Sequence, residues 1–380
     1  MKKRTIAILI AILLLFTSCD LMLSNQTKGK MYLICCGLGY EGGTENQALI
    51  NPLNDANALI SEFEALCTAG GYEYEIVHYT DDVHGTGLRY DDDRRFVFKH
   101  YSNESPAVSD RTMYLYPTPS LDKLDADYLT SHFLDTLDKM LEPNMPTDDD
   151  LLIFFYSGHG EDSLAHTPSK PSGPVAYYQT YSNLDESTSF ITDFSAISYD
   201  SILNHLDTYK GRQLAIFDCC YSGASTYNPE EYLHRDDNEL SYSISFYNYA
   251  DDPREDRKDI FNVSTFIEDS WNKTFDGKGG KPRRFIINSC TYAQQAMNAD
   301  FWINEPFAEY YGGLSYRLLR YLGFDVVGNQ PGISEDLKGK VVSVTGIFRG
   351  IYDNISKTLV KRATPNMTRT SYDMVVWDLR

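Results

Sequence analysis

The sequence predicts an α/β fold, a three-layer sandwich in which a mostly parallel six-stranded sheet carries helices on both faces. Its composition, 42% apolar and 23% charged residues, is that of an ordinary globular protein. Short apolar runs alternate with segments whose apolar residues recur at helical spacing, which favours alternating strands and helices. The run at residues 151–156 is apolar throughout, as expected of a central parallel strand that is buried on both faces.

The expected elements follow one another from about residue 30 to the end of the chain. Glycines at residues 70–71 and at residue 211 end the first and third helices. A loop rich in Ser, Thr and Pro is expected after the strand at residues 151–156. The expected strands lie at residues 32–36, 72–79, 151–156, 213–217, 285–287 and 374–377, and the expected helices at residues 52–66, 129–141, 202–209, 314–322 and 347–359.

The N-terminus has the pattern of an export signal. Basic residues at positions 2–4 precede an apolar run at residues 6–16. This run is too short to cross a bilayer core of roughly 30 Å, and it fits the hydrophobic part of a signal peptide. It ends at Phe16-Thr17-Ser18-Cys19, which resembles a bacterial lipoprotein signal whose Cys is lipidated and begins the mature chain. An ordinary secretory signal with an incidental Cys is the alternative.

This resemblance divides the chain into three parts. Residues 1–19 are expected to form the signal peptide that ends at the lipidated Cys19, residues 20–29 a polar tether, and residues 30–380 a single domain. Within the domain, residues 228–283 show no sustained period and are expected to form an insertion loop. The expected location is outside the cytoplasm, with the lipid anchor in a bacterial membrane.

Charge and cysteine content limit the partners and ligands. A chain with a net charge of −20 repels phosphate backbones, so nucleic acid is not expected, whereas basic peptides and divalent cations are favoured. No Cys or His spacing typical of a zinc site occurs, so no structural metal is expected. Five of the cysteines lie in or next to apolar strand-like runs and are expected to be buried thiols rather than disulfides; they are Cys35, Cys36, Cys219, Cys220 and Cys290.

Two strand ends carry residues suited to nucleophilic catalysis. In open parallel sheets, ligands bind beyond the carboxyl ends of the strands. Residues 156–160, Tyr-Ser-Gly-His-Gly, follow the third expected strand, and residues 218–223, Asp-Cys-Cys-Tyr-Ser-Gly, follow the fourth. The glycines beside His159 allow another group to approach closely. A Cys next to such a His can attack a carbonyl as a thiolate while the imidazole moves the proton.

These two blocks resemble the catalytic blocks of the caspase-like cysteine peptidases, above all the metacaspases and their bacterial relatives. The metacaspase form of the second block is Asp-Ser-Cys-His-Ser-Gly, from which this sequence differs by Cys219 and Tyr221. The resemblance extends over most of the chain and implies a caspase-like fold and peptidase activity. Further agreement, in the same order along the chain, covers residues 53–56, 289–290, 295–296, 312–315 and 363–366.

By this resemblance Cys220 is the nucleophile and His159 is the general base and acid. The family stabilises the oxyanion with backbone N–H groups, which correspond here to those of Cys220 and Gly160. A thioester acyl-enzyme is the implied intermediate. Side chains alternate along an extended segment, so Cys219 is expected to face away from His159 and to pack beneath the sheet.

The resemblance also implies a specificity for basic residues. Metacaspases bind Arg or Lys in an acidic pocket, whose positions correspond here to Asp55 and Asp218, with Ser157 at the rim. Buried carboxylates are costly unless they meet a cation, and a guanidinium can bind both through paired hydrogen bonds. The expectation is a Cys-His endopeptidase that cleaves after Arg or Lys and not after Asp. The alternative role for Asp55 is a cap of the first helix.

No cofactor is expected to be required. Metacaspases are often calcium-dependent, but Tyr227 stands near the position of the acid that follows their nucleophile block. Asp185, Glu186 and Asp193 are the remaining candidate calcium ligands, and a solvated acidic face is the favoured interpretation of them. The insertion loop offers basic residues eligible for self-cleavage, which are Arg254, Arg257, Lys258, Lys278 and Lys281.

Two other function classes stay open at this point. The first is a catalytically silent caspase-like lipoprotein that acts as a binding module. The second is a clostripain- or legumain-like peptidase of different specificity. The presence of both Cys220 and His159 favours an enzyme, and the acidic pair Asp55 and Asp218 argues against an Asn-directed peptidase.

Overall fold

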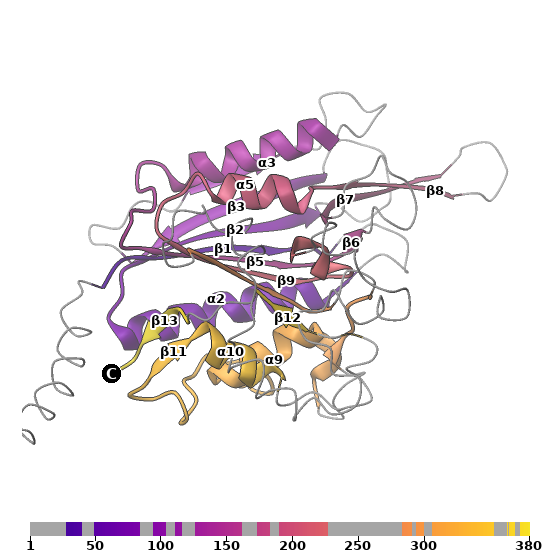
Figure 1. Cartoon of the computed structure of the whole chain (residues 1–380). Coiled ribbons are helices and arrows are strands. Elements are labelled where there is room, and N and C mark those ends of the chain that lie inside the picture. Colours follow the sequence, from indigo (N-terminus) through magenta and orange to yellow (C-terminus); the bar gives the residue numbers. More distant parts are fainter. Residues whose placement is uncertain are drawn as a thin grey trace, which may run out of the picture.

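The computed structural model of the chain gives one central sheet with helices on both sides (Figure 1). The signal peptide, residues 20–27 of the tether and nearly all of the insertion loop lie outside the residues that the structure describes. The described residues are 28–39, 49–83, 94–103, 111–115, 126–161, 173–182, 190–226, 283–290, 294–299, 306–352, 363, 365–368 and 373–380.

The central sheet has eight strands and not the six that the sequence predicts. Its middle is parallel, as expected, and consists in spatial order of β2 (Tyr74–Val83), β1 (Met31–Gly37), β5 (Leu151–Ser157), β9 (Arg212–Asp218) and β10 (Arg284–Asn288). Antiparallel strands extend both edges: β3 (Arg94–Ser102) and β4 (Arg111–Leu115) beyond β2, and β12 (Asn366–Met367) beyond β10.

The sequence prediction misses these edge strands for a physical reason. β3 begins with two arginines and contains Lys99 and His100, so it lacks the continuous apolar run of a strand buried on both faces. β12 spans only Asn366–Met367, too short for any period. The strand expected at residues 374–377 exists as β13 (Val375–Asp378), but it pairs with β11 (Val341–Ser343) in a separate two-stranded sheet.

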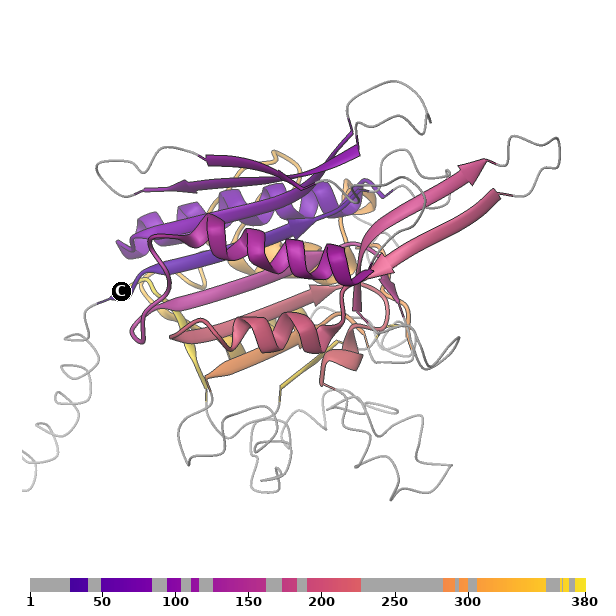
Figure 2. The ribbon, with the colours of Figure 1, turned by 90° about the horizontal axis from the view of Figure 1, so that it is seen from above.

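Helices cover both faces of the sheet and confirm the three-layer architecture. One face carries α2 (Asn51–Gly70), α9 (Gly313–Leu322) and α10 (Val344–Tyr352). The other face carries α3 (Ala126–Leu141) and α5 (Tyr199–Leu206), which lie over the strands in Figure 2. The helix expected at residues 347–359 is α10, and Ile355 and Leu359 fall outside the described residues.

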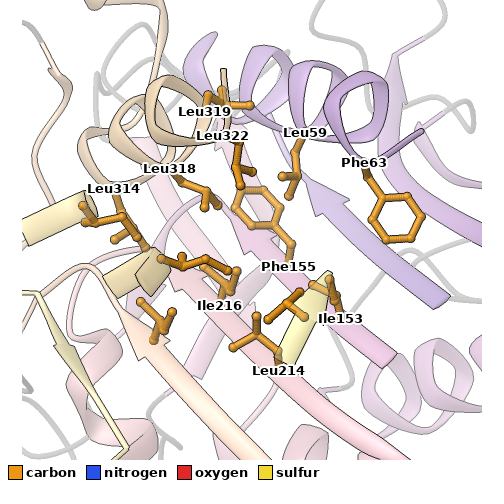
Figure 3. Packing of buried hydrophobic residues seen from close by; sticks show 14 of the residues in the cluster. Leu59, Phe63, Ile153, Phe155, Leu214, Ile216, Leu314, Leu318, Leu319 and Leu322 are labelled. Atoms are coloured by element: carbon orange, nitrogen blue, oxygen red, sulfur yellow. The ribbon is translucent and has the colours of Figure 1, made fainter. Parts of the chain in front are cut away.

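The burial of β5 explains its continuous apolar run. Ile153 and Phe155 belong to the cluster beneath α2 and α9, whereas Leu152 and Phe154 belong to the cluster beneath α3 and α5. Both faces therefore need apolar side chains. Figure 3 shows the first cluster, with side chains of α2 and α9 directed at the strands; its labelled residues are Leu59, Phe63, Ile153, Phe155, Leu214, Ile216, Leu314, Leu318, Leu319 and Leu322.

The loop expected after residue 156 contains a second sheet instead. β6 (Gly160–Glu161) pairs with β7 (Gly173–Ser182), which pairs with β8 (Phe190–Ala196). The hairpin of β7 and β8 extends away from the body of the molecule (Figures 1 and 2). Because β6 begins directly after His159, this hairpin arises at the edge of the sheet where the catalytic blocks lie.

Candidate active site

The two predicted catalytic blocks leave the sheet at the same edge. β5 and β9 are adjacent parallel strands whose register pairs Ser157 with Asp218. The N–H of Gly158 then donates to the carbonyl of Asp218 at 3.3 Å. The residues that follow each strand therefore start side by side, as the strand order in the sequence analysis requires.

Backbone contact between the two blocks is closest at Gly160. A Cβ atom placed on Gly160 would lie 2.0 Å from the carbonyl oxygen of Cys220 and 3.1 Å from its nitrogen. Only glycine permits this approach, so the backbone that follows His159 is pressed against the peptide of Cys220. His159 is half-buried, and its carbonyl accepts a hydrogen bond from the Tyr156 hydroxyl at 2.7 Å.

The two adjacent cysteines occupy different environments. Cys219 is fully buried among the residues beneath α3 and α5, and its sulfur lies 3.3 Å from the Tyr199 hydroxyl. Cys220 is less buried. Burial, together with a smaller contribution from Cys290, raises the pKa of the Cys220 thiol to about 12. A neighbouring base is therefore needed to generate the Cys220 thiolate at neutral pH.

A sharp turn follows Cys220. Tyr221 has a φ of 59°, in the left-handed region that bulky residues rarely adopt. Its N–H donates to the carbonyl of Gln294 at 2.8 Å. The chain then enters the short 3-10 helix η1 (Ser222–Thr226). Cys220 therefore lies in the connection between β9 and η1.

The predicted pocket acids meet although they lie on different elements. Asp55 is on α2 and Asp218 ends β9, and 0% and 4% of their surfaces are exposed. The Ser157 hydroxyl donates to Asp55 Oδ2 at 2.7 Å. A Cβ atom on Gly312 would lie 2.8 Å from Asp55 Oδ2 and 2.4 Å from Asp218 Oδ2, so Gly312 sits against both carboxylates.

Neutral groups hold both carboxylates. The N–H of Gly312 donates to Asp55 Oδ1 at 3.0 Å. The N–H and hydroxyl of Ser315 donate to Asp218 Oδ2 at 2.9 Å and 2.7 Å. Burial raises the pKa of Asp55 well above its ordinary value, and the charge of Asp218 raises it further. Burial likewise raises the pKa of Asp218. A positive charge next to the pair would favour the ionised form of both carboxylates.

The structure settles one alternative and adds two residues. Asp55 does not cap α2, because the N-cap is Ile50, without a side-chain hydrogen bond, and the partners of Asp55 lie outside the helix. Gly312 and Ser315 were matched as part of a sequence block, but their role as donors to Asp55 and Asp218 was not predicted. The glycine pair before a helix was the available signal, because the first N–H groups of a helix lack partners.

Two further observations concern metals and membranes. Within the described ranges, no group of three His, Cys, Asp or Glu side chains could hold a metal ion. Asp185, Glu186 and the side chain of Asp193 lie outside what the structure describes, as do the candidate self-cleavage residues of the insertion loop. Across the described segments, no helix is both long and apolar enough to cross a bilayer. The five cysteines expected to be free thiols are free, and so is Cys67.

Two solved structures show how distant the similar proteins are. A secreted C11 cysteine protease from Bacteroides thetaiotaomicron has 11% sequence identity and a TM-score of 0.35, over 86% of this chain and 58% of that one. The chain thus spans less than two thirds of that protease. Caspase-1 from Spodoptera frugiperda has 9% identity and a TM-score of 0.37, over 90% of this chain and 87% of that one. No curated protein matches the sequence.

The family assignment depends on a sequence match that covers most of the chain. Residues 30–301 match the model of the caspase domain family. This match includes the two catalytic blocks, Asp55 and all five parallel strands of the central sheet. The chain therefore belongs to the caspase domain family, the caspase-like cysteine peptidases.

Proposed function

We propose that the chain is a cysteine endopeptidase that cleaves peptide bonds after Arg or Lys. The observation that carries this proposal is the buried pair Asp55 and Asp218, held by neutral donors beside the strand ends of Cys220 and His159. Two buried carboxylates that share no cation among the described residues are costly to the free protein. The side chain of a basic substrate residue would offset that cost.

In the proposed mechanism, His159 removes the proton from the Cys220 thiol, and the thiolate attacks the carbonyl carbon of the basic residue. The backbone N–H groups of Cys220 and Gly160 would stabilise the oxyanion, and each such donor is worth about 10²–10³ in rate. His159 then donates its proton to the leaving amine, and the C–N bond breaks to leave a thioester. Water, deprotonated by His159, hydrolyses the thioester and restores the thiol.

The pocket would select the charge of the substrate side chain. A guanidinium between Asp55 and Asp218 can donate paired hydrogen bonds to carboxylates, while Ser157, Gly312 and Ser315 keep both acids oriented. An Asp side chain would add a third negative charge to the same site. We therefore propose substrates that are proteins or peptides with exposed Arg or Lys, and no nucleic acid.

Other parts of the proposal concern cofactor and location. We propose that no cofactor is required, because the Cys220 and His159 chemistry needs only water as co-reactant. We further propose that the protein acts outside the cytoplasm, anchored to a bacterial membrane through Cys19. This location is supported by the basic residues, apolar run and Cys of residues 1–19.

Hydrolysis of matched fluorogenic peptides tests the function. The peptides differ only at the cleaved residue, which is Arg, Lys, citrulline or Asp. We expect turnover of the Arg and Lys peptides, at least 10²-fold slower turnover of the citrulline peptide, whose side chain is the neutral analogue of Arg, and none of the Asp peptide. Cys220→Ala should abolish hydrolysis, whereas the neighbouring Cys219→Ala should retain it. Preferred cleavage of the Asp peptide would refute the specificity.

The same experiment separates the competing classes. A binding module without activity would hydrolyse none of the peptides, and an Arg-directed chloromethylketone would leave Cys220 unlabelled. A clostripain- or legumain-like enzyme of other specificity would be labelled at Cys220 by a chloromethylketone that carries a different residue in place of Arg. Mapping the alkylated Cys by mass spectrometry therefore distinguishes an unreactive Cys220 from a reactive Cys220 beside a pocket of different specificity.

A further inference from the structure

The turn that carries Cys220 is strained and must be held by its surroundings. A left-handed conformation is unfavourable for a non-glycine residue such as Tyr221, and such residues persist only where neighbouring contacts fix them. Two of the contacts next to Cys220 come from the segment that follows β10. The carbonyl of Cys219 accepts from the Ser289 hydroxyl at 3.1 Å, and the N–H of Tyr221 donates to Gln294 at 2.8 Å.

Both ends of η1, which follows this turn, are bound to the end of β10. The Ser222 hydroxyl accepts from the N–H of Cys290 at 3.2 Å. The Ser225 hydroxyl donates to Asn288 Oδ1 at 2.9 Å. The segment after Cys220 is therefore positioned by Asn288 and Cys290 of the neighbouring strand and its extension.

One further side chain connects these two supports. Asn366 of β12 donates from Nδ2 to the carbonyl of Cys290 at 2.9 Å, and its Oδ1 accepts from Asn288 Nδ2 at 2.9 Å. The register of the edge pair places Asn288 opposite Asn366, and both residues are fully buried. A single amide thus holds both residues that bind η1.

We propose that Asn366 is a positioning residue for the nucleophile, acting through Asn288, Cys290 and η1 on the turn at Cys220. This inference rests on the proposed role of Cys220. Without the Asn366 amide, the buried Cys290 carbonyl and the buried Asn288 amide each lose a hydrogen bond of 2.9 Å. Compensating for these lost bonds requires both residues to move, and a displacement of about 1 Å at a reacting group can cost roughly 10²-fold in rate.

A matched pair of variants in the same edge segment tests the proposal. Asn366→Ala removes the connecting amide. Thr368→Val removes a hydroxyl, also buried, that accepts from the N–H of Ile286 at 2.8 Å, so it loosens β10 away from the turn. We expect Asn366→Ala to lower kcat on the Arg peptide about tenfold or more with KM within about threefold. Thr368→Val should leave both constants within about twofold at a similar loss of thermal stability.

The alkylation rate of Cys220 by iodoacetamide at pH 7 gives a second measurement that needs no substrate. It should fall in Asn366→Ala and remain unchanged in Thr368→Val. Equal kcat values and alkylation rates in both variants would overturn the proposal. If Asn366→Ala does not fold, Ser225→Ala removes the hydrogen bond between η1 and Asn288 at a partly exposed residue. An unchanged kcat of Ser225→Ala would also overturn the proposal. Failure of the proposed function appears separately, as wild-type protein that alkylates at Cys220 but hydrolyses no Arg peptide.

Discussion

Buried carboxylates at the two ends of the central sheet have different kinds of hydrogen-bond partner. At the end where the parallel strands begin, Glu75 of β2 binds Lys30 Nζ and His100 Nε2, each at 2.8 Å. Although burial opposes the shift, these hydrogen bonds hold the pKa of Glu75 below its ordinary value. At the end where the strands finish, Asp55 and Asp218 have neutral donors and each other, and burial raises both pKa values.

We propose that this difference separates a structural acid from a binding site. Because its pKa is lowered, Glu75 contributes stability above the unfolded pKa, and this contribution is lost as the pH falls through the folded pKa. The raised pKa values of Asp55 and Asp218 mean that ionising the pair opposes folding as the pH rises. Glu75 has a lysine and a histidine of this chain as partners, whereas Asp55 and Asp218 have neutral donors and, in our proposal, receive their cation from the substrate.

The largest expected effect is on catalysis, and it comes from removing one charge of the pair Asp55 and Asp218. Asp55→Asn should lower kcat/KM for the Arg peptide roughly 10²-fold, because the guanidinium loses one of its two buried counter-charges. The free energy of unfolding at pH 7 should be unchanged or higher, since the repulsion from Asp218 is removed. Peptide kinetics and urea denaturation measure the two quantities. A large loss of stability with unchanged kcat/KM would make Asp55 a structural acid like Glu75.

The matched substitution at the opposite end should give the reverse result. Glu75→Gln leaves Lys30 without its buried counter-charge, which typically costs about 3 kcal/mol of unfolding free energy. The kcat/KM of the remaining folded protein on the Arg peptide should stay within about twofold of wild type. Urea denaturation at pH 7, followed by active-site titration, gives both values. The comparison fails if this variant loses specific activity without losing stability.

A smaller effect, on selectivity, is expected from pH. Protons compete with the guanidinium for Asp55 and Asp218, because burial and mutual repulsion raise the pKa of Asp55 and burial raises that of Asp218. The ratio of kcat/KM for the Arg and citrulline peptides should therefore fall as the pH decreases from 8 to 5, by up to about tenfold per unit below the pair's pKa. The protonation of Cys220 and His159 affects both peptides equally, so its effect cancels in the ratio. A ratio independent of pH would mean that the pair does not bind the cation.

The periodicity of the sequence predicted the elements whose burial is complete or one-sided. Strands β1, β5 and β9 are buried on both faces, so their central positions are apolar, and the helices α2 and α9 show apolar residues on one side. β7 and β8 pair mainly with each other in a sheet apart from the central one, so no continuous apolar run marks them. Asn288 and Asn366 were equally invisible as a pair, because a polar residue in a sequence does not show which amide it will meet.

The sequence by itself predicted the strands that carry the candidate nucleophile and base, and the structure confirms that these strands are adjacent and parallel, so that they end at one edge of the sheet. Only the tertiary structure decided which groups face the acids. Asp55, Asp218 and Gly312 come from α2, β9 and the start of α9, and their contacts arise from the packing of helices on the sheet. The free-energy cost of two neighbouring buried charges depends on the distance between them and on the local dielectric, which are properties of the folded chain and not of its amino-acid sequence.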